Sequence, residues 1–247
     1  MTLKSPHEIA IMRQAGAITR GALSAAAQAV RPGITTLEID RIVEDYIRAA
    51  GAVPSFKGYG DFPGSACISV NEQVVHGIPS DRMLQEGDIV SIDVGAVFNG
   101  FHGDAARTYP VGRISADAQR LIDVTRQCFF EGIRYAKLGC RMGDLSAAIQ
   151  TYAEAAGFSV VRELIGHGVG RELHESPDVP NYGIAGRGLR FQEGMTIAVE
   201  PMINAGTRRV RTLQDGWTVV TADGAYSAHY ENSIAVTDGE PLILTAV

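Results

Sequence analysis

The segments LQEGDIVSID (residues 84–93) and FQEGMTIAVE (residues 191–200) are two copies of one pattern. Each begins with a polar Gln-Glu-Gly turn, continues as an apolar run typical of a buried strand, and ends on an acidic residue. The two terminal acids, Asp93 and Glu200, are 107 residues apart. An internal repeat of this kind predicts two related halves that pack against each other.

Further echoes lie on both sides of this pattern. Before it, R-x-G (31–33) corresponds to K-x-G (137–139), and Tyr46 with AAG (49–51) corresponds to Tyr152 with AAG (155–157), at an offset of 106 residues. After it, HGD (102–104) lines up with HYE (229–231) at an offset of 127. Chance can produce short echoes, but three in the same order predict one domain over 1–247 with pseudo-symmetric halves at about 1–112 and 113–247. The growing offset predicts a loop insertion in the second half.

The local signals predict an α+β fold. Capping boxes and glycine stops predict helices over 5–30 and 35–51, and similar signals predict helices over 115–137 and 143–157. Alternating apolar and polar residues predict antiparallel strands joined by hairpins over 64–76 and 87–111. Helices followed by strands, twice, are typical of this class.

The composition of the chain argues against several classes of protein. A net charge of −6 and a pI of about 5.5 argue against a broad nucleic-acid-binding surface. The three cysteines form no CxxC pair, which favours a reducing compartment over a disulfide framework. The sequence has neither a secretory signal nor an apolar run long enough to span a membrane, so we expect a cytoplasmic protein.

The repeat brings acidic residues together. It places Asp93 with Glu200 and Asp104 with Glu231 on equivalent strands, so four carboxylates converge near the pseudo-twofold axis. A turn at 99–100 would return the chain so that Asp104 lies beside Asp93. Because buried like charges repel, such a group needs positive charge between its members, and divalent cations supply it.

Histidines complete the candidate site. His167 lies in the glycine-rich segment GHGVG (166–170) and offers a nitrogen ligand. One imidazole with four carboxylates suits manganese, iron or cobalt better than a thiolate zinc site, and two such metals sharing a hydroxide can hydrolyse a carbonyl or phosphoryl bond. His76 and His174 each stand in a His-x-x-Pro pattern, one in each half. Taken one at a time, each acidic residue could be an ordinary turn residue, and His167 could be a structural histidine. His76 and His174 could be loop histidines on a solvated surface. His102 and His229 are expected to alternate away from the ligands along their strands and to act as structural or supporting residues.

These motifs resemble one family over nearly the entire chain. The segments VHGIP (75–79), IDV (92–94), GD (103–104), GHGVGR (166–171), EPMINAG (200–206) and YEN (230–232) are similar to those of type I methionine aminopeptidases. The resemblance implies a pita-bread fold, in which a pseudo-twofold repeat packs helices outside a curved antiparallel sheet. It also implies a dinuclear metallo-exopeptidase that removes the N-terminal methionine before a small second residue, by attack of a hydroxide shared between two metals.

The resemblance implies a role for each candidate residue. Asp93 and Asp104 would bind one metal, Asp104 and Glu231 would bridge both, and His167 and Glu200 would complete the second site. The cofactors would be two divalent ions, with Co, Mn, Fe or Zn as candidates. Catalysis would rest on Glu200 as general base, on His174 beside the substrate carbonyl, and on His76 beside the peptide nitrogen.

Two further sets follow from the same resemblance. The methionine side chain would bind among Tyr59, Phe62, Cys67 and Trp217, where Phe56 and the Glu172-Leu173 pair depart from the commonest pattern. A structural monovalent cation would lie at Asn71, Gln73 and Ser227. The partners would be N-terminal methionine peptides and nascent chains, with no nucleic acid or membrane, and the protein is expected to be a monomer.

Alternatives remain within and outside the family. Prolidase and aminopeptidase P share the metal set, but they carry an additional N-terminal domain, and here the first helix is expected near residue 5. The type II enzymes carry a helical insertion for which the span from Glu200 to Glu231 is too short. A non-enzymatic binding module would have lost metal ligands, and a phosphohydrolase would need more basic residues near the ligand motifs than Arg171.

Overall fold

The computed structural model describes residues 2–246, and its helices begin where local capping signals place them. Helix α1 (Pro6–Ala29) starts at a capping box formed by Ser5 and Glu8, and α2 (Thr36–Ala49) at one formed by Thr35 and Glu38. In the second half, α3 spans Ala116–Ile133 and α4 spans Met142–Ala155. A short 3₁₀ helix, η1, covers Tyr59–Asp61.

The first half is built on a four-stranded sheet. Its long hairpin joins β4 (Ile89–Phe98) to β5 (Phe101–Pro110) through Asn99 and Gly100, whose φ angles of 49° and 76° form the predicted tight turn. Strands β2 (Ala66–Val70) and β1 (Val53–Pro54) both pair antiparallel with β4. Strand β3 (Gln73–Val75) follows β2 but pairs with β12 of the second half, so the predicted hairpin over 64–76 was wrong in its partner.

The second half carries a related arrangement with an extra lobe. One sheet has the order β15-β14-β9-β7-β8, and a smaller sheet has the order β13-β10-β6. The extra strands β11 and β12 form the third sheet with β3 and supply the predicted insertion. The bounds are β6 Ser159–Val160, β7 Gly166–Gly168, β8 Glu175–Val179, β9 Thr196–Val199, β10 Met202–Asn204, β11 Val210–Thr212, β12 Val219–Thr221, β13 Ser227–His229, β14 Asn232–Ala235 and β15 Leu242–Ile243.

Hydrogen bonds confirm the internal repeat at the predicted offsets. The amide of Leu84 donates to Ile34 O at 2.8 Å, and the amide of Phe191 donates to Cys140 O at 3.1 Å. The donors differ by 107 residues and the acceptors by 106, as in the sequence. The same offsets relate further backbone bonds: Thr36 N to Arg82 O with Met142 N to Leu189 O, and Leu37 N to Ser80 O with Gly143 N to Arg187 O.

The strand register corrects the predicted correspondence between residues 102–104 and 229–231. Strand β4 pairs Ser91 with Thr108, and β9 pairs Ala198 with Ser233, so the returning strands correspond at an offset of 125 residues rather than 127. At this offset the structural counterpart of Asp104 is His229, whereas Glu231 corresponds to Ala106. The predicted equivalence of Asp104 and Glu231 was therefore wrong by two residues, although residues two apart share a strand face.

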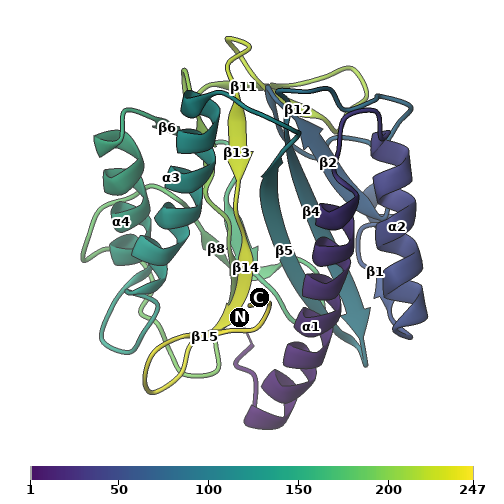
Figure 1. Ribbon diagram of the computed structural model, residues 1–247. Helices are drawn as coiled ribbons and strands as arrows, with labels where there is room; N and C mark the ends of the chain where they lie inside the picture. The colour runs from purple at the N-terminus through teal and green to yellow at the C-terminus, as the bar shows by residue number, and fades with distance from the viewer. Residues whose placement is uncertain (1, 247) are drawn as a thin grey trace.

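The two halves face each other along one seam. Figure 1 shows α1 and α2 over the strands of one half and α3 and α4 over those of the other, with β14 beside β5 between them. The amide of Glu231 donates to Ala106 O at 2.9 Å across this seam. Each half keeps its own apolar core, which includes Ile92 in the first half and Ile197 in the second. Helix α3 ends at Ile133, before the predicted 137, because Arg134 caps it and tight turns follow.

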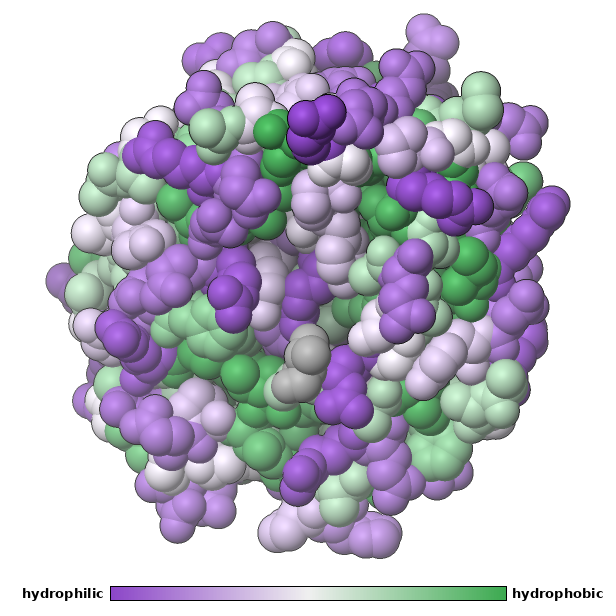
Figure 2. All heavy atoms as spheres, viewed as in Figure 1, coloured by the Kyte–Doolittle hydropathy of each residue, from purple (hydrophilic) through white to green (hydrophobic). Residues whose placement is uncertain are grey.

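Polar and charged side chains cover much of the helix-bearing face, with apolar residues visible between them (Figure 2). Within residues 2–246, no helix combines the length and the apolar character that crossing a membrane requires.

Candidate active site

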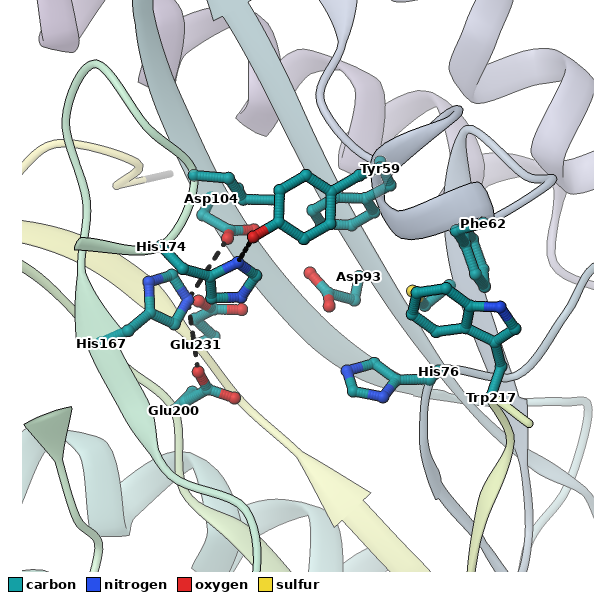
Figure 3. Close-up of a pocket in the computed structure, with 13 residues that line it drawn as sticks. Tyr59, Phe62, His76, Asp93, Asp104, His167, His174, Glu200, Trp217 and Glu231 are labelled. Atoms are coloured by element: carbon teal, nitrogen blue, oxygen red, sulfur yellow. Dashed lines mark hydrogen bonds and ion pairs between the residues drawn. The ribbon is translucent and has the colours of Figure 1, made fainter. Parts of the chain in front are cut away.

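Five predicted ligand groups converge from both halves. Asp93 on β4 and Asp104 on β5 project from one face of the first sheet, while His167 on β7, Glu200 after β9 and Glu231 before β14 come from the second half (Figure 3). His167 Nε2 lies 3.6 Å from Glu200 Oε1 and 3.7 Å from Asp104 Oδ2. The ligand atoms of Asp104, His167 and Glu231 all lie within 4.8 Å of one another.

Keeping these buried carboxylates ionised costs free energy unless a cation lies between them. Asp104 and Glu231 are 3% and 2% exposed. Burial, followed by repulsion from neighbouring carboxylates, raises the pKa of Asp93, Glu200 and Glu231 well above their usual range. Burial also raises the pKa of Asp104 to about 7.

The unpaired atoms of the cluster fit bound divalent cations. Asp93 Oδ1, Asp104 Oδ1 and Glu231 Oε1 are buried and accept no hydrogen bond from the described residues. His167 Nδ1 lies 2.8 Å from Gly168 O and donates to it, so Nε2 carries the lone pair that faces the carboxylates. Burial lowers the pKa of His167 to about 4, which keeps its imidazole neutral. An oxygen-rich set with one neutral imidazole is a donor set for Mn²⁺, Fe²⁺ or Co²⁺.

Two histidines beside the predicted ligands differ from the prediction in direction, while a structural or supporting role agrees with their contacts. Because residues two apart on a strand share a face, His102 does not alternate away from Asp104; its Nδ1 hydrogen-bonds Ser55 Oγ at 2.9 Å. His229 is 2% exposed, and its Nε2 lies 3.5 Å from Glu200 Oε2 and 4.0 Å from Glu231 Oε2. The signal that could have corrected the prediction was the spacing of two residues in both segments.

An apolar cavity of about 130 Å³ opens directly onto the cluster. Phe62 and Trp217 pack edge to face in its wall, with ring centroids 5.1 Å apart. Cys67, which pairs with Asp93 across β2 and β4, brings the wall up against the carboxylates. All four predicted pocket residues line the cavity, and so do Phe56 and Leu173, the two departures from the family pattern.

Two further histidines stand at this cavity. His174 Nδ1 lies 2.7 Å from the Tyr59 hydroxyl, and its ring centroid lies 4.2 Å from that of His167. His76 adopts φ of 58°, a left-handed conformation that is rare for a large side chain. Its ring packs edge to face with that of Trp217, with the ring centroids 6.1 Å apart. The structure therefore brings both His-x-x-Pro histidines to the wall of the cavity, where His76 is partly buried and His174 is exposed.

A buried ion pair holds the loop that carries His174. Lys4 Nζ contacts Glu175 Oε2, and their side chains are only 4% and 16% exposed. The other carboxylate oxygen, Oε1, accepts the amides of Arg171 at 2.8 Å and Glu172 at 3.2 Å. Gly170 packs so closely on Lys4 that a Cβ there would lie 2.4 Å from Lys4 Cε. The start of the chain thus shapes one wall of the cavity.

The residues of the predicted cation site are partly brought together. Ser227 N donates to Asn71 O at 2.9 Å, and Gln73 lies two residues beyond Asn71. The side-chain oxygens of Asn71 and Gln73 are already used, since they accept the amides of Ile89 and Val70. A cation site formed by these three residues stays a prediction.

Comparisons with known proteins agree with this geometry. Residues 10–238 match metallopeptidase family M24. A methionine aminopeptidase of Clostridium perfringens is 56% identical over 245 residues, covering 99% of this chain and 98% of the relative. Methionine aminopeptidase 1 of Bacillus subtilis is 53% identical over 244 residues, covering 99% of this chain and 98% of the relative.

Solved structures confirm the predicted pita-bread fold. The methionine aminopeptidase of Thermotoga maritima superposes with a TM-score of 0.98 at 44% identity, and the match covers 100% of both chains. The prolidase of Pyrococcus furiosus shares the fold with a TM-score of 0.82 at 24% identity, over 65% of that longer chain. The chain therefore belongs to metallopeptidase family M24, within which it groups with the bacterial methionine aminopeptidases.

Proposed function

We propose that this protein is a metal-dependent exopeptidase that removes the N-terminal methionine from peptides and nascent chains, preferring a small second residue. The observation that carries the proposal is one juxtaposition: an apolar cavity ends directly at a buried cluster of four carboxylates and one imidazole. Relatives named methionine aminopeptidase, similar over the whole chain, support the same substrate.

The metal-holding residues follow from the donor set. Asp93 and Asp104 would hold one cation, His167 and Glu200 a second, with Asp104 and Glu231 shared between them. Two divalent cations would polarise the scissile carbonyl and lower the pKa of the attacking water. Because the ligands come from both halves, we propose that residues 1–247 act as a single catalytic domain.

The chain's own residues would divide the remaining work. Glu200, at the floor of the cavity, would accept the proton of the attacking water. His174 would donate a hydrogen bond to the carbonyl oxygen as negative charge develops there, the kind of stabilisation that contributes most to acyl-transfer catalysis. Its Nδ1 is engaged by Tyr59, which orients the ring so that Nε2 is the free nitrogen. His76, beside Trp217 of the cavity wall, would contact the peptide nitrogen.

The cavity has the chemistry of a methionine pocket. A flexible thioether gains area burial and sulfur–aromatic contacts of about 0.3–1.5 kcal/mol each. Tyr59, Phe62 and Trp217 supply aromatic rings, while Cys67 and Leu173 supply aliphatic surface. The cavity is small and ends at the metal-ligand cluster, so it admits one side chain and leaves the rest of the substrate outside.

Three finer points belong to the same proposal. The protein works in the cytoplasm, where nascent chains emerge, and acts as a monomer because each chain contains all five ligand groups. A monovalent cation at Asn71, Gln73 and Ser227 stiffens the junction of β3 and β13. None of these points is needed for the reaction itself.

A direct assay tests the function. Metal-free protein is reconstituted with Mn²⁺, Fe²⁺ or Co²⁺, and methionine release from Met-Ala-Ser is compared with cleavage of an Xaa-Pro dipeptide. Release from Met-Ala-Ser alone is expected. Failure with all three metals would reject the proposal, and preference for the proline substrate would assign the chain to the other branch of the family.

A further inference from the structure

The side chain of His229 is buried beside the ligand cluster without a hydrogen-bonding partner. It is 2% exposed, and its Nε2 has no donor or acceptor partner among residues 2–246. Two carboxylate oxygens lie close to this nitrogen, Glu200 Oε2 at 3.5 Å and Glu231 Oε2 at 4.0 Å. Burying a polar nitrogen without a partner destabilises the fold, so its position beside two carboxylates suggests a functional role.

Two hydrogen bonds to the Thr108 side chain fix the backbone of His229. Thr108 Oγ1 accepts the amide of His229 and donates to its carbonyl, both at 2.9 Å. The repeat mirrors this contact, since Ser233 Oγ accepts the amide of Asp104 and donates to its carbonyl, both at 3.0 Å. His229 therefore occupies in the second half the position that Asp104 occupies in the first.

His229 nevertheless differs from the five ligand groups in one respect. Those five all line the cavity, whereas His229 does not, although its Nε2 lies 3.5 Å from Glu200 Oε2. An imidazole in that place can reach the carboxylate but does not meet the substrate. It is suited to orient a ligand, as hydrogen-bonding partners behind metal ligands commonly do.

We infer that His229 is a positioning residue: its Nε2–H donates to Glu200 Oε2 and aims the other oxygen, Oε1, at the cluster. The inference rests on the proposed function, in which Glu200 is both ligand and base. A fixed carboxylate loses less conformational entropy on binding a metal and presents its oxygen in one direction. Partners of this kind change metal affinity or activity by about 10- to 100-fold.

The test compares variants that differ in the donor. His229→Leu and His229→Met replace the imidazole by an apolar side chain of similar size that has no hydrogen-bond donor. His229→Gln replaces it by an amide that still has an N–H donor. The readouts are Mn²⁺ affinity by titration calorimetry, the unfolding midpoint of the metal-free protein, and methionine release. Thr221→Val serves as control, because it removes a buried hydroxyl that bonds Ala225 O at 2.7 Å rather than a ligand.

The expected result separates positioning from support of the fold. The Leu and Met variants should bind Mn²⁺ about 10- to 100-fold more weakly, with an unchanged or higher unfolding midpoint without metal. His229→Gln should restore most of the affinity, and the control should bind like the unaltered protein. Unchanged affinity in the Leu variant, or loss of the folded metal-free protein in both apolar variants, would overturn the inference. Failure of the unaltered protein itself to bind Mn²⁺ would reject the proposed function instead.

Discussion

Replacing Lys4 by Met tests whether the start of the chain shapes the active site. The substitution keeps the length of the side chain and removes the charge that Glu175 contacts in a buried setting. Losing one partner of a buried pair costs about 3–5 kcal/mol. Here the carboxylate keeps two amide donors and is partly exposed, so about 2–3 kcal/mol is expected. For a chain of this size that lowers Tm by about 4–12 °C.

Activity should fall with metal content unchanged. The loop over 171–175 carries Leu173 and His174, and a displacement of about 1 Å in a substrate-contacting group can cost about 100-fold in rate. The assay measures kcat/KM on Met-Ala-Ser together with bound metal. Lys137→Met is the matched control, because it breaks an exposed pair with Glu240 and should cost less than about 1 kcal/mol.

A double-mutant cycle with Glu175→Gln sharpens the test. Each single change leaves a buried partner uncompensated, whereas the double variant leaves two neutral groups in contact. The double variant should therefore be more stable than the sum of the single effects implies. Additive losses of stability, or an unchanged kcat/KM in Lys4→Met, would refute the reasoning.

Other expectations follow from the same geometry. Asp104→Ala or Glu231→Ala should abolish turnover and lower metal stoichiometry, and full activity in either would contradict the ligand assignment. His174→Ala should lower kcat by about 100-fold with metal retained, since the side chain is proposed to contact the substrate rather than the cations; metal loss would move it into the ligand set. The raised pKa of Asp104, to about 7, means that the metal-free folded protein holds protons which the unfolded chain releases above about pH 4. The contribution of Asp104 to stability should therefore fall as pH rises from about 4 to 7, opposite in sign to that of His167, whose pKa is lowered to about 4. Melting curves of the unaltered protein and of Asp104→Asn in EDTA isolate this contribution, and Mn²⁺ should reverse the loss at pH 8.

Much of the candidate site could be predicted from sequence because the proposed ligands stand in short local motifs. Asp93, Asp104, His167, Glu200 and Glu231 were all identified before the fold was known, and the structure brings them together. The helices were predicted for the same reason, since a capping box is completed within four residues. The repeat was readable because this part of the second copy is only one residue longer than the first, which changes the offset from 106 to 107.

Other features depend on contacts between segments that are distant in sequence. Lys4 meets Glu175 across 171 residues, and neither position carries a local signal for the other. The counterpart of Asp104 is His229 because β14 returns beside β9 after an insertion whose length does not reveal the strand register. Strand alternation fixes which face a side chain occupies, but only the hydrogen-bonded pairing of two strands decides which residues stand opposite each other.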